Sequence, residues 1–209
     1  FYRKLNRNML MDIQEDIPVY EDYCWMSSAQ IALLLNRSNM VNMDSRSVLS
    51  CMLKKDKKDC PVHADHHLSE WLSAMKNRHH LETKWVALDQ LEDWHFHEHH
   101  IRHRDEKYFT VVGIETRASN REVHSWRQPI FKETNIGLAG LIIKEINETP
   151  HYLMQVVLEA GKTSVKLAPT VQCSDYKKRA GSVPYLDRLL HGGKILYDQI
   201  QSEEGGRFY

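Results

Sequence analysis

The second half of the chain contains a series of short segments rich in Val, Ile, Tyr and Thr, and this series constrains the fold more than any other feature. These residue types favour the pleated surface of a β-sheet. Turn-forming stretches such as 147–150 and 159–162 separate neighbouring segments, as expected between antiparallel strands. The predicted strands are 108–116, 122–131, 137–146, 151–158, 164–171 and 194–201.

The first 80 residues show a helical pattern instead. Apolar residues at 31–35 follow two serines, possible N-caps precede 45–53, and 67–76 places its apolar residues on one helical face. A further helix at 183–190 has Pro184 in its first turn and glycines after its end. The sequence therefore predicts an α+β fold: a mixed or antiparallel sheet with flanking helices and a helical N-terminal segment. The composition changes near residue 80, which is the best candidate for a domain boundary.

Composition and charge disfavour several classes of protein. The 28 basic and 28 acidic residues balance among 209, so no basic field is available to bind nucleic acid. No apolar run approaches the roughly 20 residues that cross a bilayer, and no signal peptide core follows the N-terminus. Four scattered cysteines suit buried positions in a reducing compartment. We therefore expect a cytoplasmic protein with no nucleic-acid or membrane partner.

The stretch 122–129 is the most informative candidate for a ligand site. Strand alternation would place Glu122, His124, Trp126 and Gln128 on one face. An indole beside an amide and ionisable groups suits a planar, hydrogen-bonding ligand such as a nucleobase. The alternative is an exposed sheet face on which the tryptophan covers an edge.

Two other stretches combine residues that could contact a ligand. Thr170 and Gln172 share one face of a predicted strand, and Pro169 argues against an ordinary central strand. After the last predicted strand come two carboxylates, two glycines and an arginine, which suit a general base, close backbone approach and a phosphate contact. The residues of this stretch are Glu203, Glu204, Gly205, Gly206 and Arg207. The alternative is that they form only a surface turn.

A histidine-rich stretch at 95–103 raises the possibility of a metal site. His95, His97 and His99 would project from one strand face. No acid or cysteine ligands have a recognised spacing around them, and the charged neighbours indicate a solvated hairpin. We therefore predict no metal site. The dinucleotide, P-loop, zincin and α/β-hydrolase motifs do not occur in the sequence.

Four motifs together resemble the NDP-hexose 2,3-dehydratase family of deoxysugar biosynthesis. They occur in the family's order at 42–51, 122–129, 167–172 and 202–208. The resemblance also includes 89–94 and 183–187, and is weakest across 54–81. It implies a Nudix-like fold, two tandem halves per subunit and a homodimer. Residues 1–80 would then be a bridging segment with helices, comprising the end of a preceding repeat and a linker. Residues 81–209 would be one half that is cut before its last strand. No Nudix box is present, so the fold would not imply pyrophosphate hydrolysis.

The resemblance also implies a reaction and its residues. The substrate would be a dTDP-4-keto-6-deoxyhexose that loses water across C2 and C3, with neither redox cofactor nor metal. Glu203 or Glu204 would be the base, and Gly205 and Gly206 would allow close approach of the sugar. Trp126 or Trp94 would stack on the base, and Arg207 would contact phosphate through its charge. The residues that would hold the substrate are Trp94, Ser125, Trp126, Gln128, Thr170, Gln172 and Arg207. His124 occupies a variable position of the motif and receives no role.

Two alternatives to catalysis stay open for this half. It could bind nucleotide sugar without converting it, or it could serve only dimerisation. The second alternative predicts that Trp126, Gln128 and Thr170 line no common cavity. The pair of glutamates before Gly205 favours catalysis.

Overall fold

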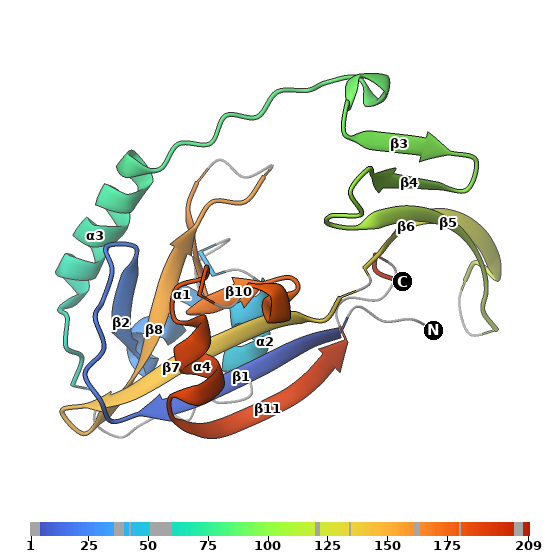
Figure 1. Cartoon of the computed structure of the whole chain (residues 1–209). Helices are drawn as coiled ribbons and strands as arrows, with labels where there is room; N and C mark the ends of the chain where they lie inside the picture. The colour runs from blue at the N-terminus through green and yellow to red at the C-terminus, as the bar shows by residue number, and fades with distance from the viewer. Residues whose placement is uncertain are drawn as a thin grey trace. The chain divides into compact units, whose positions relative to one another are not determined.

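The computed structural model describes residues 5–35, 40–41, 43–50, 60–119, 122–133, 135–160, 164–179, 181–202 and 207–209. The chain forms two compact units (Figure 1). The large unit comprises Arg7–Thr83 and Leu138–Gln199, and the small unit comprises Phe1–Asn6, Lys84–Gly137 and Ile200–Tyr209. One border therefore falls close to the predicted change near residue 80, but each unit is assembled from separate stretches of the chain. Within the described residues, no helix is both long and apolar enough to span a membrane.

The large unit is built on a seven-stranded sheet with the order β11-β1-β7-β8-β2, in which β10 pairs with β7 and β9 pairs with β8. The pairs β7–β8, β8–β2, β8–β9 and β7–β10 are antiparallel. The strands are β1 (Leu5–Ile13), β2 (Tyr23–Ser27), β7 (Gly137–Ile146), β8 (Thr149–Val157), β9 (Lys166–Ala168), β10 (Val171–Cys173) and β11 (Lys194–Ser202).

Helices bury both faces of this sheet, as Figure 1 shows. Leu141 and Ile143 of β7 pack in one core cluster with α1, α2 and α3, whereas Ile142 packs in a second cluster with α4. The alternation of strand side chains explains this division. Because both faces are covered, β7 is an almost continuous apolar run. The helices are α1 (Ser28–Leu35), α2 (Met43–Ser50), α3 (Asp65–Arg78) and α4 (Leu186–His191), with a short 3-10 turn, η2, at Tyr176–Lys178.

The first 80 residues differ from the prediction of a helical segment. The three helices are present, but β1 and β2 precede them. In β1, Leu10 belongs to one core cluster and Met9 and Met11 belong to the other. A strand buried on both faces shows no alternation of polar and apolar residues. The sequence of such a strand therefore lacks the two-residue pattern by which a strand is recognised. The α+β class is confirmed, and the helical N-terminal segment is not.

The predicted strand 164–171 is two strands in the structure. β9 ends at Ala168 and pairs with β8, whereas β10 begins at Val171 and pairs with β7. Pro169 lies at the change of partner, where its missing N–H removes a ladder hydrogen bond. The chain therefore switches partner strand at the motif Pro169-Thr170.

The small unit contains a four-stranded antiparallel sheet with the order β3-β4-β5-β6. A 3-10 turn, η1 (Leu88–Gln90), precedes it. The strands are β3 (Trp94–His97), β4 (His100–His103), β5 (Thr110–Arg117) and β6 (Ser125–Lys132). The long β5–β6 ladder was expected from the alternating Val, Ile and Thr of these segments. This sheet carries four of the candidate site residues: Trp94, Ser125, Trp126 and Gln128.

Candidate functional site

The register of the small unit defines which candidate side chains share a face. Residues directly opposite each other in an antiparallel pair lie on the same face, as do residues two apart along a strand. Trp126 lies opposite Thr116, and Gln128 lies opposite Ile114. The Trp126 face, as we call it, consists of Trp126, Gln128, Ile130 and Lys132 of β6, Thr110, Val112, Ile114 and Thr116 of β5, His100 and Arg102 of β4, and His95 and His97 of β3.

Trp126 and Gln128 are held together on this face. The indole Nε1 of Trp126 donates a hydrogen bond of 2.6 Å to Oε1 of Gln128, and both side chains are half-buried. Position 125, predicted to contact substrate, is an exposed serine on the opposite face. The prediction that Glu122 and His124 extend the same strand face is not met, because β6 begins at Ser125. His124 lies before the strand, with Nδ1 3.2 Å from the carbonyl oxygen of Ala118.

Trp94 lies at the corner of the sheet diagonal to Trp126. It is on β3 opposite His103, at the end where β5 begins, whereas Trp126 lies opposite Thr116 at the other end of β5. The ring of Trp94 stacks on Tyr108 at a centroid distance of 6.4 Å and meets His103 edge-on at 5.7 Å. The two indoles cannot stack on the same base, so the alternatives Trp94 and Trp126 describe two different sites.

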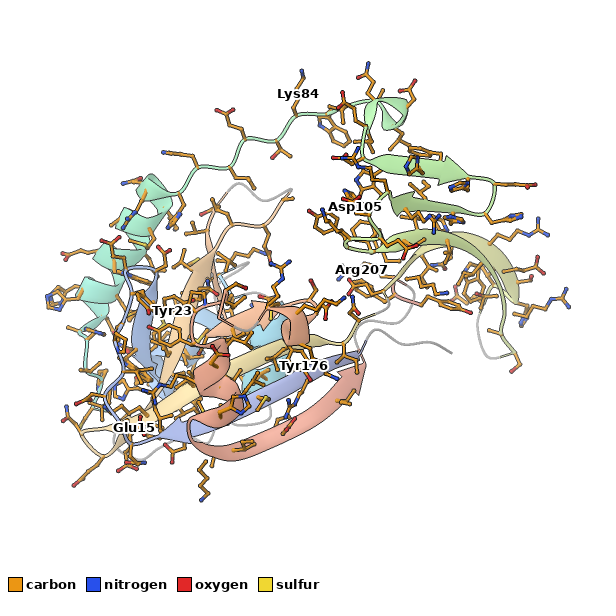
Figure 2. The ribbon with its side chains drawn as sticks, viewed as in Figure 1. Glu15, Tyr23, Lys84, Asp105, Tyr176 and Arg207 are labelled. Atoms are coloured by element: carbon orange, nitrogen blue, oxygen red, sulfur yellow. The ribbon has the colours of Figure 1, made fainter. Side chains whose placement is uncertain are left out.

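The last described residues extend the β6 edge of the sheet. The amide of Phe131 donates to the carbonyl of Arg207 at 2.8 Å, and the amide of Tyr209 donates to the carbonyl of Phe131 at 2.7 Å. This is a parallel bridge between Phe131 and Phe208. Arg207, labelled in Figure 2, is exposed and places its guanidinium carbon 4.8 Å from the centroid of the Phe208 ring. Glu203, Glu204, Gly205 and Gly206 lie outside the described residues.

Thr170 and Gln172 belong to the large unit, where they differ in exposure. Thr170 is fully buried, and its Oγ1 accepts a bond of 3.0 Å from the Ile142 amide and donates one of 2.5 Å to the Leu153 carbonyl. Gln172 lies opposite Ala139 and is exposed. The described hydrogen bonds of Thr170 therefore connect its hydroxyl, between β9 and β10, to the backbones of β7 and β8.

The histidines of β3 and β4 occupy neighbouring positions on the Trp126 face. His97 lies opposite His100, and their ring centroids are 4.6 Å apart. Burial lowers the pKa of His100, and the proximity of His97 and Arg102 lowers it further. His99 lies in the turn between the strands. In the part of the chain that the structure describes, no three His, Cys, Asp or Glu side chains are grouped so that they could hold a metal ion.

The opposite face of β5 and β6 carries an exposed ion-pair network. Glu115 accepts a hydrogen bond of 2.8 Å from Arg127 and lies 3.5 Å from Arg117. Exposed pairs of this kind are screened by water and contribute little to stability. The Trp126 face is therefore the one on which half-buried aromatic, amide and basic groups meet.

Comparison with known proteins identifies the family. The model of the NDP-hexose 2,3-dehydratase family matches residues 1–52 and 65–209. The chain belongs to this family. The unmatched residues, 53–64, fall in the charged stretch where the resemblance was weakest.

Three curated relatives carry the name dTDP-4-dehydro-6-deoxy-alpha-D-glucopyranose 2,3-dehydratase, and each aligns with 100% of this chain. The protein of Amycolatopsis orientalis is 35% identical over 215 residues, and 46% of its own length is covered. The protein of Saccharopolyspora spinosa is 37% identical with 49% covered, and that of Streptomyces violaceoruber is 36% identical with 51% covered. The chain therefore spans about half the length of the curated relatives it matches.

The strand register also brings onto the Trp126 face residues for which the sequence suggested a different role or none. His97, His100 and Arg102 share a face with Trp126 and Gln128, although some 25 residues separate them in the chain. Their sequence signal, the cluster of histidines, suggested only a metal site. Cross-strand register, which brings them onto the Trp126 face, depends on pairings that no local pattern specifies.

Proposed function

We propose that the protein of which this chain is a part removes water across C2 and C3 of a dTDP-4-keto-6-deoxyhexose, giving a 3,4-diketo-2,6-dideoxyhexose. The family match over 1–52 and 65–209 carries this proposal. The relatives, each at least 35% identical over the whole of this chain, are named as 2,3-dehydratases of such a sugar nucleotide. This activity makes the protein a hydro-lyase of deoxysugar biosynthesis.

The elimination needs three chemical roles. The C4 carbonyl acidifies the C3 proton, and a general base removes that proton to leave an enolate. The enolate then expels the C2 hydroxyl, which an acid protonates to water, and the resulting C3 enol relaxes to the 3,4-diketone. A positioned base contributes about 10²–10⁴-fold to the rate. Hydrogen-bond donors aimed at the developing C4 oxyanion contribute about 3–4 kcal/mol each.

We assign the base to Glu203 or Glu204. Sequence order supports this choice, because only two glycines separate the glutamates from Arg207. The carbonyl of Arg207 is bonded to Phe131 of β6, the strand that also carries Trp126. Four residues of chain span at most about 14 Å. Gly205 and Gly206 have no side chain to obstruct the sugar.

The nucleotide site proposed here is centred on Trp126 and Gln128. An indole offers a stacking surface for thymine, and an amide can hydrogen-bond the edge of the base. Arg207 would contact phosphate through its guanidinium group. Ser125, Trp94, Thr170 and Gln172 remain proposed substrate contacts from the family resemblance alone, and the buried bonds of Thr170 favour a structural contribution.

We also propose a Nudix-like fold for this half, a homodimeric protein and a cytoplasmic location. The α+β architecture and the family membership support the fold. An exposed apolar stretch, with Trp85 99% and Leu88 64% exposed, supports contact with another chain or chain segment. Sedimentation velocity of wild type and of Trp85→Ser tests the homodimer: the variant should shift towards monomer.

The catalytic assignment is tested by Glu203→Gln and Glu204→Gln made separately. Exchange of the C3 proton for deuterium, followed by NMR, reports the first step alone. We expect one variant to slow exchange and elimination by about 10²–10⁴-fold, while Glu115→Gln, on the opposite face of the small sheet, retains activity. Normal rates in both variants would contradict the assignment. Tight dTDP binding without any exchange in wild type would favour the alternative, a half that binds nucleotide sugar without converting it.

A further inference from the structure

Two neighbouring rows of the Trp126 face carry nitrogen-bearing side chains. One row runs from Ile130 through Val112 to His100 and His97. The next runs from Lys132 through Thr110 to Arg102 and His95. Neither row contains a carboxylate. The described positions therefore gather nitrogen-bearing side chains from β3, β4 and β6 on one end of the face that also carries Trp126.

His100 has an unsatisfied nitrogen in the middle of these rows. Its Nε2 is buried and has no hydrogen-bond partner, the one such side-chain atom found among the described residues. A buried polar atom without a partner is costly and calls for an explanation such as an absent ligand. Burial and the neighbouring basic groups lower the pKa of His100, so near neutral pH the ring is neutral and can donate one N–H. The charge of the rows comes from Arg102 and Lys132.

The spacing between the aromatic and basic parts of the face suits a nucleoside diphosphate. His100 is one pleat, about 7 Å, along the sheet from the level of Gln128 and two strands, about 10 Å, across it. The separation of about 12 Å is comparable to the distance between the base and the terminal phosphate of such a molecule in an extended conformation. A base bound at Trp126 and Gln128 would direct its phosphates towards His100 and Arg102.

We propose that His97 and His100 of the first row and Arg102 of the second form one diphosphate-binding site, called the diphosphate row from here on. It holds the phosphates of the nucleotide sugar while Trp126 and Gln128 hold its base. This inference rests on the proposed function, because it takes the nucleotide end of that substrate as the ligand. It assigns His100 as a hydrogen-bond donor to a phosphate oxygen and Arg102 as the charged partner. These residues take the place of Arg207 as the phosphate contact, because Arg207 lies beside Phe131 on the other edge of β6. The guanidinium group can hold two phosphate oxygens at once.

The guanidinium group of Arg102 already forms an ion pair with a carboxylate. Nη1 of Arg102 lies 3.0 Å from Oε1 of Glu106, and both side chains are exposed. A phosphate must share or displace this contact. Removing the carboxylate by Glu106→Gln should therefore strengthen anion binding, whereas Arg102→Gln should weaken it. The opposite signs of these two variants distinguish a phosphate site from a general loss of folding.

Calorimetric titration of the chain with thymidine, dTDP and inorganic pyrophosphate tests the row. We expect Arg102→Gln and His100→Asn each to weaken the binding of dTDP and of pyrophosphate by about tenfold or more. The affinity for thymidine should stay unchanged. Arg127→Gln is the matched control, since Arg127 lies on the opposite face of β6 with a similar exposed ion pair. Its effect should stay within about threefold. Circular dichroism establishes that each variant is folded.

Each outcome separates this inference from the function on which it rests. Equal dTDP affinity in wild type and Arg102→Gln would overturn the row and leave the proposed function standing. An equal loss in Arg127→Gln would also overturn it, because the effect would then be one of overall charge. If neither thymidine nor dTDP binds, the nucleotide assignment fails, and pyrophosphate binding that depends on Arg102 would still support the row. Absence of binding for thymidine, dTDP and pyrophosphate alike would overturn both the diphosphate row and the nucleotide assignment.

Discussion

The indole Nε1 of Trp126 donates a hydrogen bond of 2.6 Å to Oε1 of Gln128, two residues along the same strand face. This bond orients the Gln128 amide, because its oxygen must face the indole and its NH2 group must therefore face away. An amide held in this way presents donors in a fixed direction. The pair thus combines an aromatic surface with an oriented hydrogen-bonding edge, the two features that the proposed nucleobase site uses.

Replacement of Trp126 should weaken nucleotide binding in two steps. Trp126→Phe retains a ring but loses the hydrogen bond, whereas Trp126→Ala removes the stacking surface, worth about 1–3 kcal/mol for one base. Calorimetry with dTDP should show the larger loss in the alanine variant. Trp94→Phe tests the alternative stacking position at the diagonal corner, and an unchanged affinity in this variant would favour Trp126. A greater loss from Trp94→Phe than from Trp126→Ala would place the base at Trp94 instead.

Gly140 of β7 has no room for a methyl group. A Cβ at this position would overlap the buried side chain of Leu189 of α4, whereas a Cβ at Gly113 of β5 would meet nothing within 4 Å. Overpacking costs about 1–3 kcal/mol, so Gly140→Ala should lower the free energy of unfolding in urea by that amount. Gly113→Ala should leave stability unchanged or raise it by up to about 1 kcal/mol. A neutral Gly140→Ala would mean that α4 can move away from the sheet.

His151 connects the start of β8 to the segment before α3. It is fully buried, its Nε2 lies 2.9 Å from the amide nitrogen of Val62, and its Nδ1 lies 2.8 Å from the carbonyl oxygen of Thr149. Since an amide can only donate, Nε2 must accept, and Nδ1 must carry the proton. We expect ¹⁵N NMR to detect this tautomer. An Nε2–H tautomer would contradict the geometry.

Loss of this ring should destabilise the protein. His151→Phe removes the acceptor of the Val62 amide and the donor to the Thr149 carbonyl, and each of these hydrogen bonds contributes about 0.5–1.5 kcal/mol. Urea unfolding measures the change. His80→Phe replaces an exposed histidine after α3 and serves as the control, with an expected change within about 0.5 kcal/mol. Equal effects of the two substitutions would show that the described bonds of His151 do not stabilise the fold.

Acid should reduce stability through two histidines with lowered pKa values. Burial lowers the pKa of His63 and His100 below the usual value of 6.5, and His67 lowers that of His63 further. Below pH 6.5 the unfolded chain therefore binds more protons than the folded chain, so the free energy of unfolding decreases as the pH falls. Urea unfolding at pH 7.5 and 5.5 measures the decrease.

Two substitutions test the origin of this pH dependence. His63→Asn removes one of the two groups and should make the decrease smaller. His66→Asn, on the exposed side of α3, should leave the decrease unchanged. An unchanged decrease in His63→Asn would show that other groups cause the acid sensitivity.

The sequence by itself determined the family and most of the regular elements. β7 was predicted with its observed bounds, and α1, α3 and β6 were located to within a few residues, because period and end signals are local. The family motifs are also local, and they identified Trp126 and Gln128 as candidate substrate contacts from the sequence alone. The glutamates at 203 and 204 remain predictions of the same kind.

Only the tertiary structure decided how these residues are grouped. The strand β1 is hidden in the sequence because both of its faces are buried, and this depends on helices far along the chain. Thr170 resembles a ligand contact in the sequence, but its hydroxyl is bonded to the backbone of two neighbouring strands. Trp94 and Trp126 appear equivalent until the register places them at diagonal corners. Strand register and burial arise from long-range pairing, so no local pattern contains them.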